Sequence, residues 1–255
     1  MKKIEFLLSA QFPFNIPSPI PASDLIPEWW KQGEAFISKT DLSLNVLDKE
    51  DRAAGMKSCI PFLDGITSGY LLLTWADIEI TENHNEVVKW QYVEKNENGM
   101  WKETESNINW DMVGERTGAI GHSMPRPAGY AINHLTWNSK WGIKVPKGWS
   151  VLITHPLSRF ELPFITSSAI MDSDRFSSHG SIPFFIKKGW TGVIPKGTPY
   201  AHIIPIKRSS WISFNRVQPE KDQFIAKSAR MVQYGFYRSK LWIPKKYKAV
   251  KNDIQ

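Results

Sequence analysis

A series of short hydrophobic segments separated by Pro-Lys-Gly turns occupies residues 142–208, and it restricts this chain to a fold built on strands. The two turn tripeptides stand at residues 146–148 and 195–197, each with a hydrophobic segment on its C-terminal side. A proline with a glycine two residues later is typical of tight turns. The segments between the turns are short and rich in β-branched and aromatic residues, which favours strands over helices.

The composition agrees with a folded, strand-rich chain. Of the 255 residues, 42% are hydrophobic and 22% are charged, so a substantial core can form. Twelve Trp and thirteen Phe are many for this length. They fit the cores and strand pairs of a β protein, or alternatively an interface rich in aromatic anchors.

The other segments add strands at the start and helices near both ends. Residues 4–8 predict a first strand, residues 12–21 an extended proline-rich passage, and residues 22–32 a short helix. Alternation of apolar and polar residues at 78–81 and 87–93 predicts a hairpin. We expect one β-rich domain over residues 1–218, with its core at 130–214, and a helical, basic and aromatic arm over residues 219–255.

The single cysteine and the hydropathy pattern indicate where the protein resides. Cys59 excludes an internal disulfide framework, and its apolar neighbours predict a buried thiol. No stretch approaches the roughly 20 apolar residues of a membrane span. These features predict a soluble protein of a reducing cytoplasm that does not bind membranes.

The net charge of +7 comes entirely from the C-terminal segment. Residues 221–255 hold nine of the 32 basic residues and two of the 25 acidic ones, which leaves 23 of each elsewhere. The last part of this segment alternates basic and aromatic side chains, and its candidate contact residues are Arg238, Lys240, Trp242, Lys245 and Lys246. Such an arm can clasp a neighbouring subunit, or it can bind nucleic acid through phosphates and stacked bases.

The compact acidic sequence Met-Asp-Ser-Asp at residues 171–174 is the best candidate for a site. We expect Asp172 and Asp174 to line a polar pocket, and four further residues are candidates for the same pocket: His155, Ser158, Arg159 and Arg175. The spacing of the six histidines does not require a metal site, so we expect no metal and no cofactor. Glycine-rich phosphate loops and the Gly-x-Ser-x-Gly elbow of hydrolases are absent from the sequence.

The order of motifs in residues 146–204 resembles the trimeric deoxyuridine triphosphatases (dUTPases). It comprises the first Pro-Lys-Gly turn, the sequence HPLS at 155–158, IMDSD at 170–174, and PKGTPYAHII at 195–204. The resemblance implies a β-clip or related β-barrel or sandwich core, and a trimer. It also implies that Asp172 is the water-activating, catalytic carboxylate of a nucleotide pyrophosphohydrolase, which would use Mg²⁺.

The sequence departs from that family at the residues that bind the substrate. Leu157 stands where the family has a phosphate-binding Arg, and Arg175 or Phe176 stands where it has a Tyr under the deoxyribose. The glycine-rich C-terminal phosphate clamp is missing. These departures favour a protein that is not an enzyme.

A second resemblance covers nearly the whole chain. The sequences PEWWK at 27–31, KSCIPF at 57–62, HPLSR at 155–159 and MDSD at 171–174 resemble an uncharacterised protein family of tailed bacteriophages. This resemblance implies a viral origin, and a place in the cytoplasm of an infected bacterium or in the virion. We therefore expect a phage-encoded binding or assembly protein, a homo-oligomer or a partner of other phage proteins. The alternatives are a nucleotide-handling enzyme or nucleotide-binding protein, and nucleic-acid binding through the arm.

Overall fold

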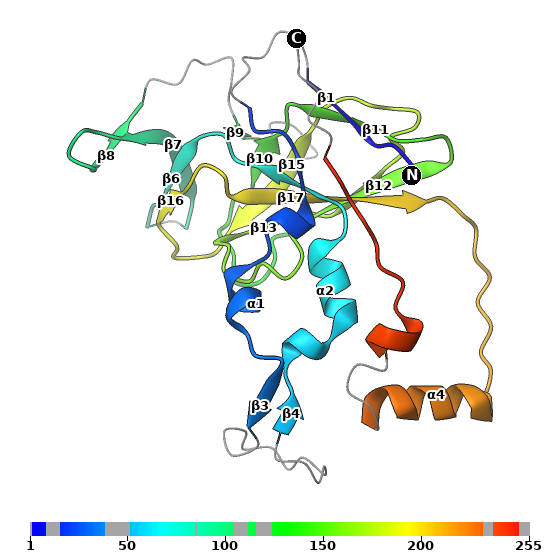
Figure 1. Ribbon diagram of the computed structural model, residues 1–255. Helices are drawn as coiled ribbons and strands as arrows, with labels where there is room; N and C mark the ends of the chain where they lie inside the picture. Colours follow the sequence, from blue (N-terminus) through cyan, green and yellow to red (C-terminus); the bar gives the residue numbers. More distant parts are fainter. Residues whose placement is uncertain are drawn as a thin grey trace. The chain divides into compact units, whose positions relative to one another are not determined.

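The computed structural model describes residues 2–8, 16–38, 52–84, 86–104, 112–115, 124–231 and 237–249, and these form two compact units (Figure 1). The first, here called the body, comprises Met1–Ile20, Gly69–Arg208 and Ala249–Gln255. The second unit comprises Pro21–Ser68 and Ser209–Lys248. This division differs from the expected domain over residues 1–218 followed by an arm, because residues 21–68 pack with the C-terminal part of the chain.

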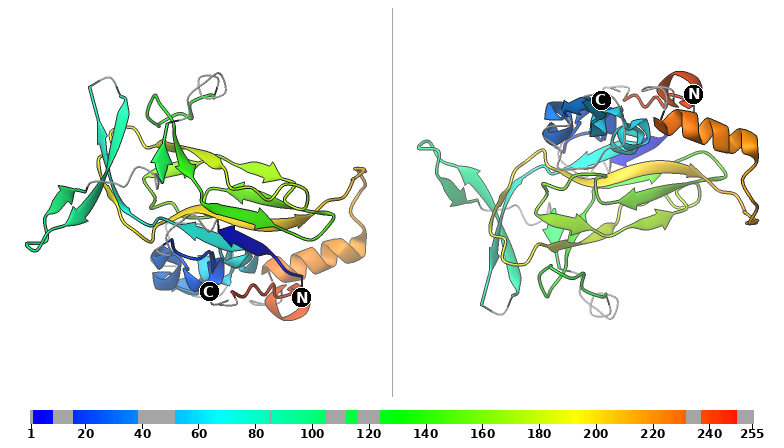
Figure 2. Two further views of the ribbon diagram at one scale, coloured as in Figure 1. Left: turned by 90° about the horizontal axis from the view of Figure 1, so that it is seen from above. Right: turned by 90° about the horizontal axis from the view of Figure 1, so that it is seen from below.

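The body consists of β-sheets, which confirms the expected mainly-β class. Its central sheet is organised around one long strand that pairs antiparallel with a neighbour on each side. The order in this sheet is β14 (Ala169–Met171), β12 (Trp149–Thr154), β17 (Pro199–Lys207), β5 (Tyr70–Leu73) and β2 (Ile20–Pro21). The central strand β17 appears as a long yellow-to-gold arrow in Figure 2.

Three further sheets complete the described part of the body. One pair is β1 (Glu5–Leu8) with β11 (Trp141–Lys144), which confirms the expected first strand. A four-stranded sheet has the order β13 (Phe164–Thr166), β15 (Ser181–Ile186), β10 (Leu135–Asn138) and β9 (Val113–Gly114). Another has the order β16 (Gly192–Ile194), β6 (Asp77–Glu82), β7 (Val88–Lys95) and β8 (Trp101–Glu103). The antiparallel pairing of β6 with β7 confirms the expected hairpin.

Both Pro-Lys-Gly sequences form the expected tight turns. Trp149 N–H donates to the Pro146 carbonyl at 3.1 Å, and Thr198 N–H donates to the Pro195 carbonyl at 3.2 Å. The glycine of each turn has a positive φ, +81° at Gly148 and +85° at Gly197, a conformation that other residues adopt only with strain. Each turn thereby delivers the chain into a strand of the central sheet.

The second unit combines short helices with one pair of strands. The expected helix at 22–32 is two shorter helices, because Pro27 caps the second one. The elements are the 3₁₀ turn η1 (Ala22–Asp24), α1 (Glu28–Gln32), β3 (Phe36–Ser38) paired with β4 (Arg52–Ala54), η3 (Met56–Ser58), α2 (Ile60–Thr67), α4 (Glu220–Met231) and the turn η5 (Tyr237–Leu241). None of the helices within the described ranges is long and apolar enough to cross a membrane.

Cys59 is exposed, and the expectation of a buried thiol is wrong. It is the capping residue that precedes α2, and that helix turns Ile60 and Ile66 into the interior instead. A capping residue lies outside the apolar stripe of its helix, so the hydrophobic neighbours of Cys59 in the sequence did not bury it.

The core of the body is centred on a cluster of aromatic rings. Trp137 on β10 is fully buried, and its ring stacks on Phe184 with centroids 3.8 Å apart and an interplanar angle of 10°. Phe164 meets the same indole edge-on at 5.0 Å. The indole N–H donates to the Thr166 hydroxyl at 3.2 Å, so the buried polar atom of Trp137 is satisfied. At Trp137 the arrangement agrees with the expectation of a tryptophan that fills the core, whereas Trp101 and Trp211 are exposed.

We expect Trp137→Ala to lower the free energy of unfolding by about 3–5 kcal/mol, because it leaves a cavity and removes the stacking partner of Phe184. Trp101→Ala is the matched control, since Trp101 is 39% exposed at the edge strand β8 and its loss should cost less than about 1 kcal/mol. Urea unfolding followed by circular dichroism measures both values. Equal losses in the two variants would contradict the assignment of Trp137 to the core.

Candidate functional site

The register of β14 against β12 places the acidic sequence beside the first Pro-Lys-Gly turn. Met171 pairs with Val151, so the residues that follow β14 run alongside the residues that precede Val151. A short turn then follows, in which the N–H groups of Arg175 and Phe176 donate to the carbonyl of Asp172 at 2.9 and 3.1 Å. The two carboxylates of Asp172 and Asp174 therefore lie at the N-terminal end of β12.

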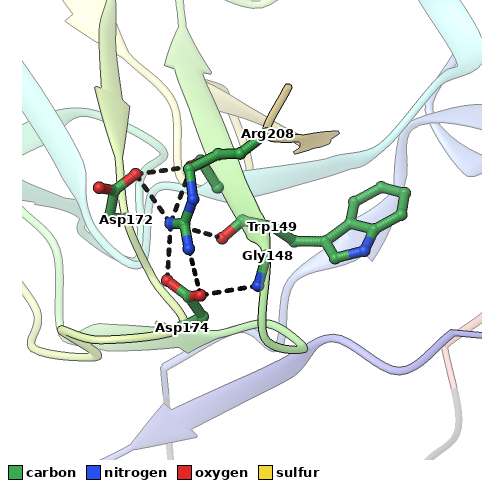
Figure 3. A network of polar contacts seen from close by, with 6 residues as sticks. Gly148, Trp149, Asp172, Asp174 and Arg208 are labelled. Carbon is green, nitrogen blue, oxygen red and sulfur yellow. Dashed lines mark hydrogen bonds and ion pairs between the residues drawn. The ribbon is translucent and has the colours of Figure 1, made fainter. Parts of the chain in front are cut away.

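Arg208 joins these carboxylates from the end of β17. Lys207 pairs with Trp149, and Arg208 N–H extends the ladder by donating to the Gly148 carbonyl at 2.9 Å. Its guanidinium binds both oxygens of Asp174, with Nη1 2.7 Å from Oδ1 and Nη2 bonded to Oδ2 (Figure 3). Nη1 also lies 3.0 Å from Asp172 Oδ1. We call this group, Asp172, Asp174 and Arg208, the strand-end clamp.

The two carboxylates differ in exposure. The side chain of Asp174 is 4% exposed, and its Oδ2 also accepts the backbone N–H of Gly148 at 2.8 Å. The hydrogen bonds from Arg208 and then Gly148 lower the pKa of Asp174 to about 2. The side chain of Asp172 is 56% exposed, and its pKa is lowered first by the Ser150 hydroxyl, which donates at 2.6 Å, and then by Arg208. Both groups are anionic at neutral pH.

This electrostatic setting suits a structural ion pair better than proton transfer. A general base works best when its pKa lies near the working pH, whereas the pKa of Asp172 is held below its usual value. Arg208 is already bound to two carboxylates, so its guanidinium is committed within the clamp. The catalytic role of Asp172 stays a prediction from the resemblance.

The expected companions of the carboxylates lie at the other end of β12. Residues 155–159 follow Thr154, the last residue of that strand, whereas the clamp adjoins its first residue. Six strand residues span roughly 16–20 Å. The structure therefore divides the expected pocket into two groups, and of the four companions only Arg175, which is exposed, adjoins the carboxylates.

His155 and Arg159 make their contacts within and beside the turn in which they lie. Thr166 N–H donates to His155 Nδ1 at 3.3 Å, and Nε2 lies 3.4 Å from the Arg159 carbonyl. Burial lowers the pKa of the His155 imidazole, which favours its neutral form. Arg159 is 9% exposed and pairs with Glu161 at 3.1 Å. Ser158 adopts a positive φ of 59°, which closes the turn between these residues.

The C-terminal residues proposed as a contact arm divide into bound and exposed side chains. In the second unit, Asp64 of α2 accepts the indole N–H of Trp242 at 2.9 Å and forms an ion pair with Lys245, whose pKa this pairing raises. Three other candidates are exposed: Arg238, Lys240 and Lys246. Their role in binding a partner or nucleic acid stays a prediction. Within the part of the chain that the structure describes, His, Cys, Asp and Glu side chains do not gather into a group of three suited to a metal ion.

Sequence reasoning missed Arg208 and Asp64. A signal for Arg208 was present, because Asp172 and Asp174 are two residues apart and alternate residues of an extended segment point to the same side. Two carboxylates on one side favour a nearby cation. Arg208 ends the strand that pairs beside them, but that neighbour is known only from the tertiary pairing.

Comparisons with known proteins identify no family for this chain. No family model matches it, and no curated protein matches it. Two solved structures of the dUTPase from phage phi11 of S. aureus are similar to parts of it, one of them a mutant enzyme. The mutant gives a TM-score of 0.31 at 8% identity, over 60% of this chain and 85% of that one. The other gives a TM-score of 0.27 at 12% identity, over 49% and 94%. Similarity this low assigns neither a fold family nor a site.

We expect Asp174→Asn to lower the Tm by about 5 °C at pH 6, because it leaves Arg208 without its charged partner. The folded-state pKa of Asp174 is depressed to about 2, so its contribution is present above the usual Asp range and is lost as the pH falls. The difference in Tm between wild type and Asp174→Asn should therefore shrink between pH 4 and pH 2. Asp172→Asn is the control and should show a smaller difference, since that side chain is exposed. A difference that does not change with pH would contradict the clamp.

Proposed function

We propose that this protein is a binding or assembly protein, not an enzyme, and that it self-associates through an exposed segment that carries four large apolar side chains. The segment is residues 209–218, here called the connector, which lies between β17 and α4 and has neither helix nor strand (Figure 1). Four of its side chains carry the proposal. They are Trp211 (88% exposed), Ile212 (83%), Phe214 (74%) and Val217 (91%).

Exposure on this scale is unusual for a monomer. Single apolar side chains at the surface are common, but contiguous ones mark interaction sites or aggregation liabilities. Burying apolar surface stabilises a contact by roughly 25 cal/mol per Å², and aromatic side chains are preferred anchors of interfaces. The connector thus presents aromatic and aliphatic side chains of the kind that anchor interfaces, and these side chains are exposed in the single chain.

The backbone of the connector supports the same conclusion. The N–H groups of residues 209–217 donate no hydrogen bond to any residue that the structure describes. Unpaired donors and acceptors in an extended apolar segment are the features by which a chain adds to a partner surface. Association would satisfy both the backbone and the side chains.

The strand-end clamp argues against the nucleotide-handling alternative. A phosphate needs a free cation, whereas Arg208 is held by Asp174 and Asp172. The resemblance to a tailed-bacteriophage family supports a partner within the same infected cell, either a second copy of the chain or another phage protein. Mass spectrometry of purified virions decides whether the assembly is carried in the particle.

The oligomeric state tests the proposal directly. By light scattering after size exclusion, the wild type should have a multiple of the chain mass of 29.2 kDa. The triple variant Trp211→Ser, Ile212→Ser, Phe214→Ser should fall to the mass of one chain, since it removes the apolar anchors. Phe160→Ser is the matched control, because Phe160 is 69% exposed in the body and lies outside the connector. A monomeric wild type, or a triple variant with unchanged mass, would contradict self-association.

A ligand screen distinguishes the nucleotide-binding alternative from the proposed assembly function. We expect deoxynucleoside triphosphates with Mg²⁺ to leave the Tm unchanged, because the clamp offers them no free guanidinium. A ligand that binds the native state raises the Tm in proportion to the logarithm of its concentration. A concentration-dependent rise that Arg208→Met abolishes would instead favour the nucleotide-binding reading.

A further inference from the structure

A groove in the second unit lies between the start of α2 and the C-terminal helices. Its volume is about 710 Å³, within the range of ligand and peptide pockets. Its apolar lining comes from α2, from α4 and from the turn η5, and the residues that matter here are Ile60, Pro61, Ile225 and Leu241. Leu241 is 43% exposed, so apolar surface is open to solvent within the groove.

We propose that this groove receives the connector of a second copy of the chain, with Trp211, Ile212 and Phe214 as the inserted side chains. The inference rests on the proposed self-association and names the surface that it uses. The groove and the connector are the two complementary halves of one contact.

Charge agrees with this pairing. The connector contains one charged residue, Arg216, and no acidic residue. Asp222 is the one charged residue in the lining of the groove, and it is exposed. A segment with exposed apolar side chains and a single cation would thus meet an apolar groove with a single carboxylate, which favours this occupant over an acidic one.

The connector of the same copy does not fill the groove. Gln218, the last residue of the connector, is part of the lining, and its carbonyl accepts the side-chain amide of Gln223 at 2.7 Å. The anchors Trp211 and Phe214 are absent from the lining and remain 88% and 74% exposed. The groove and the anchors of one chain are therefore both open at the same time.

A segment and a groove on the same chain can be exchanged reciprocally between two copies in a two-fold dimer, or passed from copy to copy around a closed ring. The proposed contact is compatible with both arrangements, and light scattering gives the number of chains.

Cys59 provides the test, because it is the single cysteine of the chain, it is exposed, and it lines the groove. In the wild-type oligomer we expect iodoacetamide to alkylate Cys59 about tenfold more slowly than in the triple connector variant, since only copies with an open groove react. Phe160→Ser should show the slow wild-type rate. Equal rates in an oligomeric wild type and a monomeric triple variant would overturn the groove assignment and leave the proposed self-association intact.

Disulfide trapping identifies the two chains. A tagged Ser213→Cys, Cys59→Ser variant mixed with untagged wild type should form a disulfide between position 213 and Cys59 of the other chain, located by peptide mapping. Ser178→Cys, Cys59→Ser is the control and should form none, because Ser178 is exposed in the body, outside the connector and the groove. The Ser213→Cys single variant, which keeps Cys59, can also form a disulfide within one chain. If that intrachain disulfide forms while the mixture gives no disulfide between chains, a second copy is not the occupant of the groove. A monomeric wild type would overturn both the inference and the proposed function.

Discussion

The antiparallel pairing of β17 with β12 on one side and β5 on the other is the constraint on which the body depends. It joins residues 199–207 to residues 149–154 and, across the strand, to residues 70–73. Because these pairings connect distant parts of the sequence, their contacts must first offset the entropy lost in closing long loops. The pairing also determines which side chains meet at the end of the strand. Arg208 reaches Asp172 and Asp174 only because Lys207 is in register with Trp149.

In the strand-end clamp, the two carboxylates of the acidic sequence are tied to Arg208 in one network of ion pairs. Asp174 is shielded, bound by a guanidinium and a backbone N–H, and held anionic by its low pKa. These contacts fasten β14 and the first Pro-Lys-Gly turn to the end of β17.

The features that point to function lie in the second unit instead. A connector with exposed aromatic anchors and an open groove with matching apolar lining are both features of one chain. Exposed apolar surface is costly to leave in water, and the proposed contact would bury it on both. This complementarity is why we favour assembly over catalysis, and why the exposed thiol of Cys59 becomes an experimental probe of the contact.

The sequence by itself determined the local structure of this protein. The Pro-Lys-Gly turns, the first strand, and the hairpin of β6 and β7 follow from residue preferences that act over a few positions. Only the tertiary structure decided that residues 21–68 belong with residues 209–248, that Cys59 is exposed, and that His155 and Asp172 lie at opposite ends of β12. Only the tertiary structure brought Arg208 to the carboxylates. The physical reason is that register and packing between distant segments depend on summed contacts across the whole fold, and no local pattern specifies which of the many basic residues will end beside a given pair of acids.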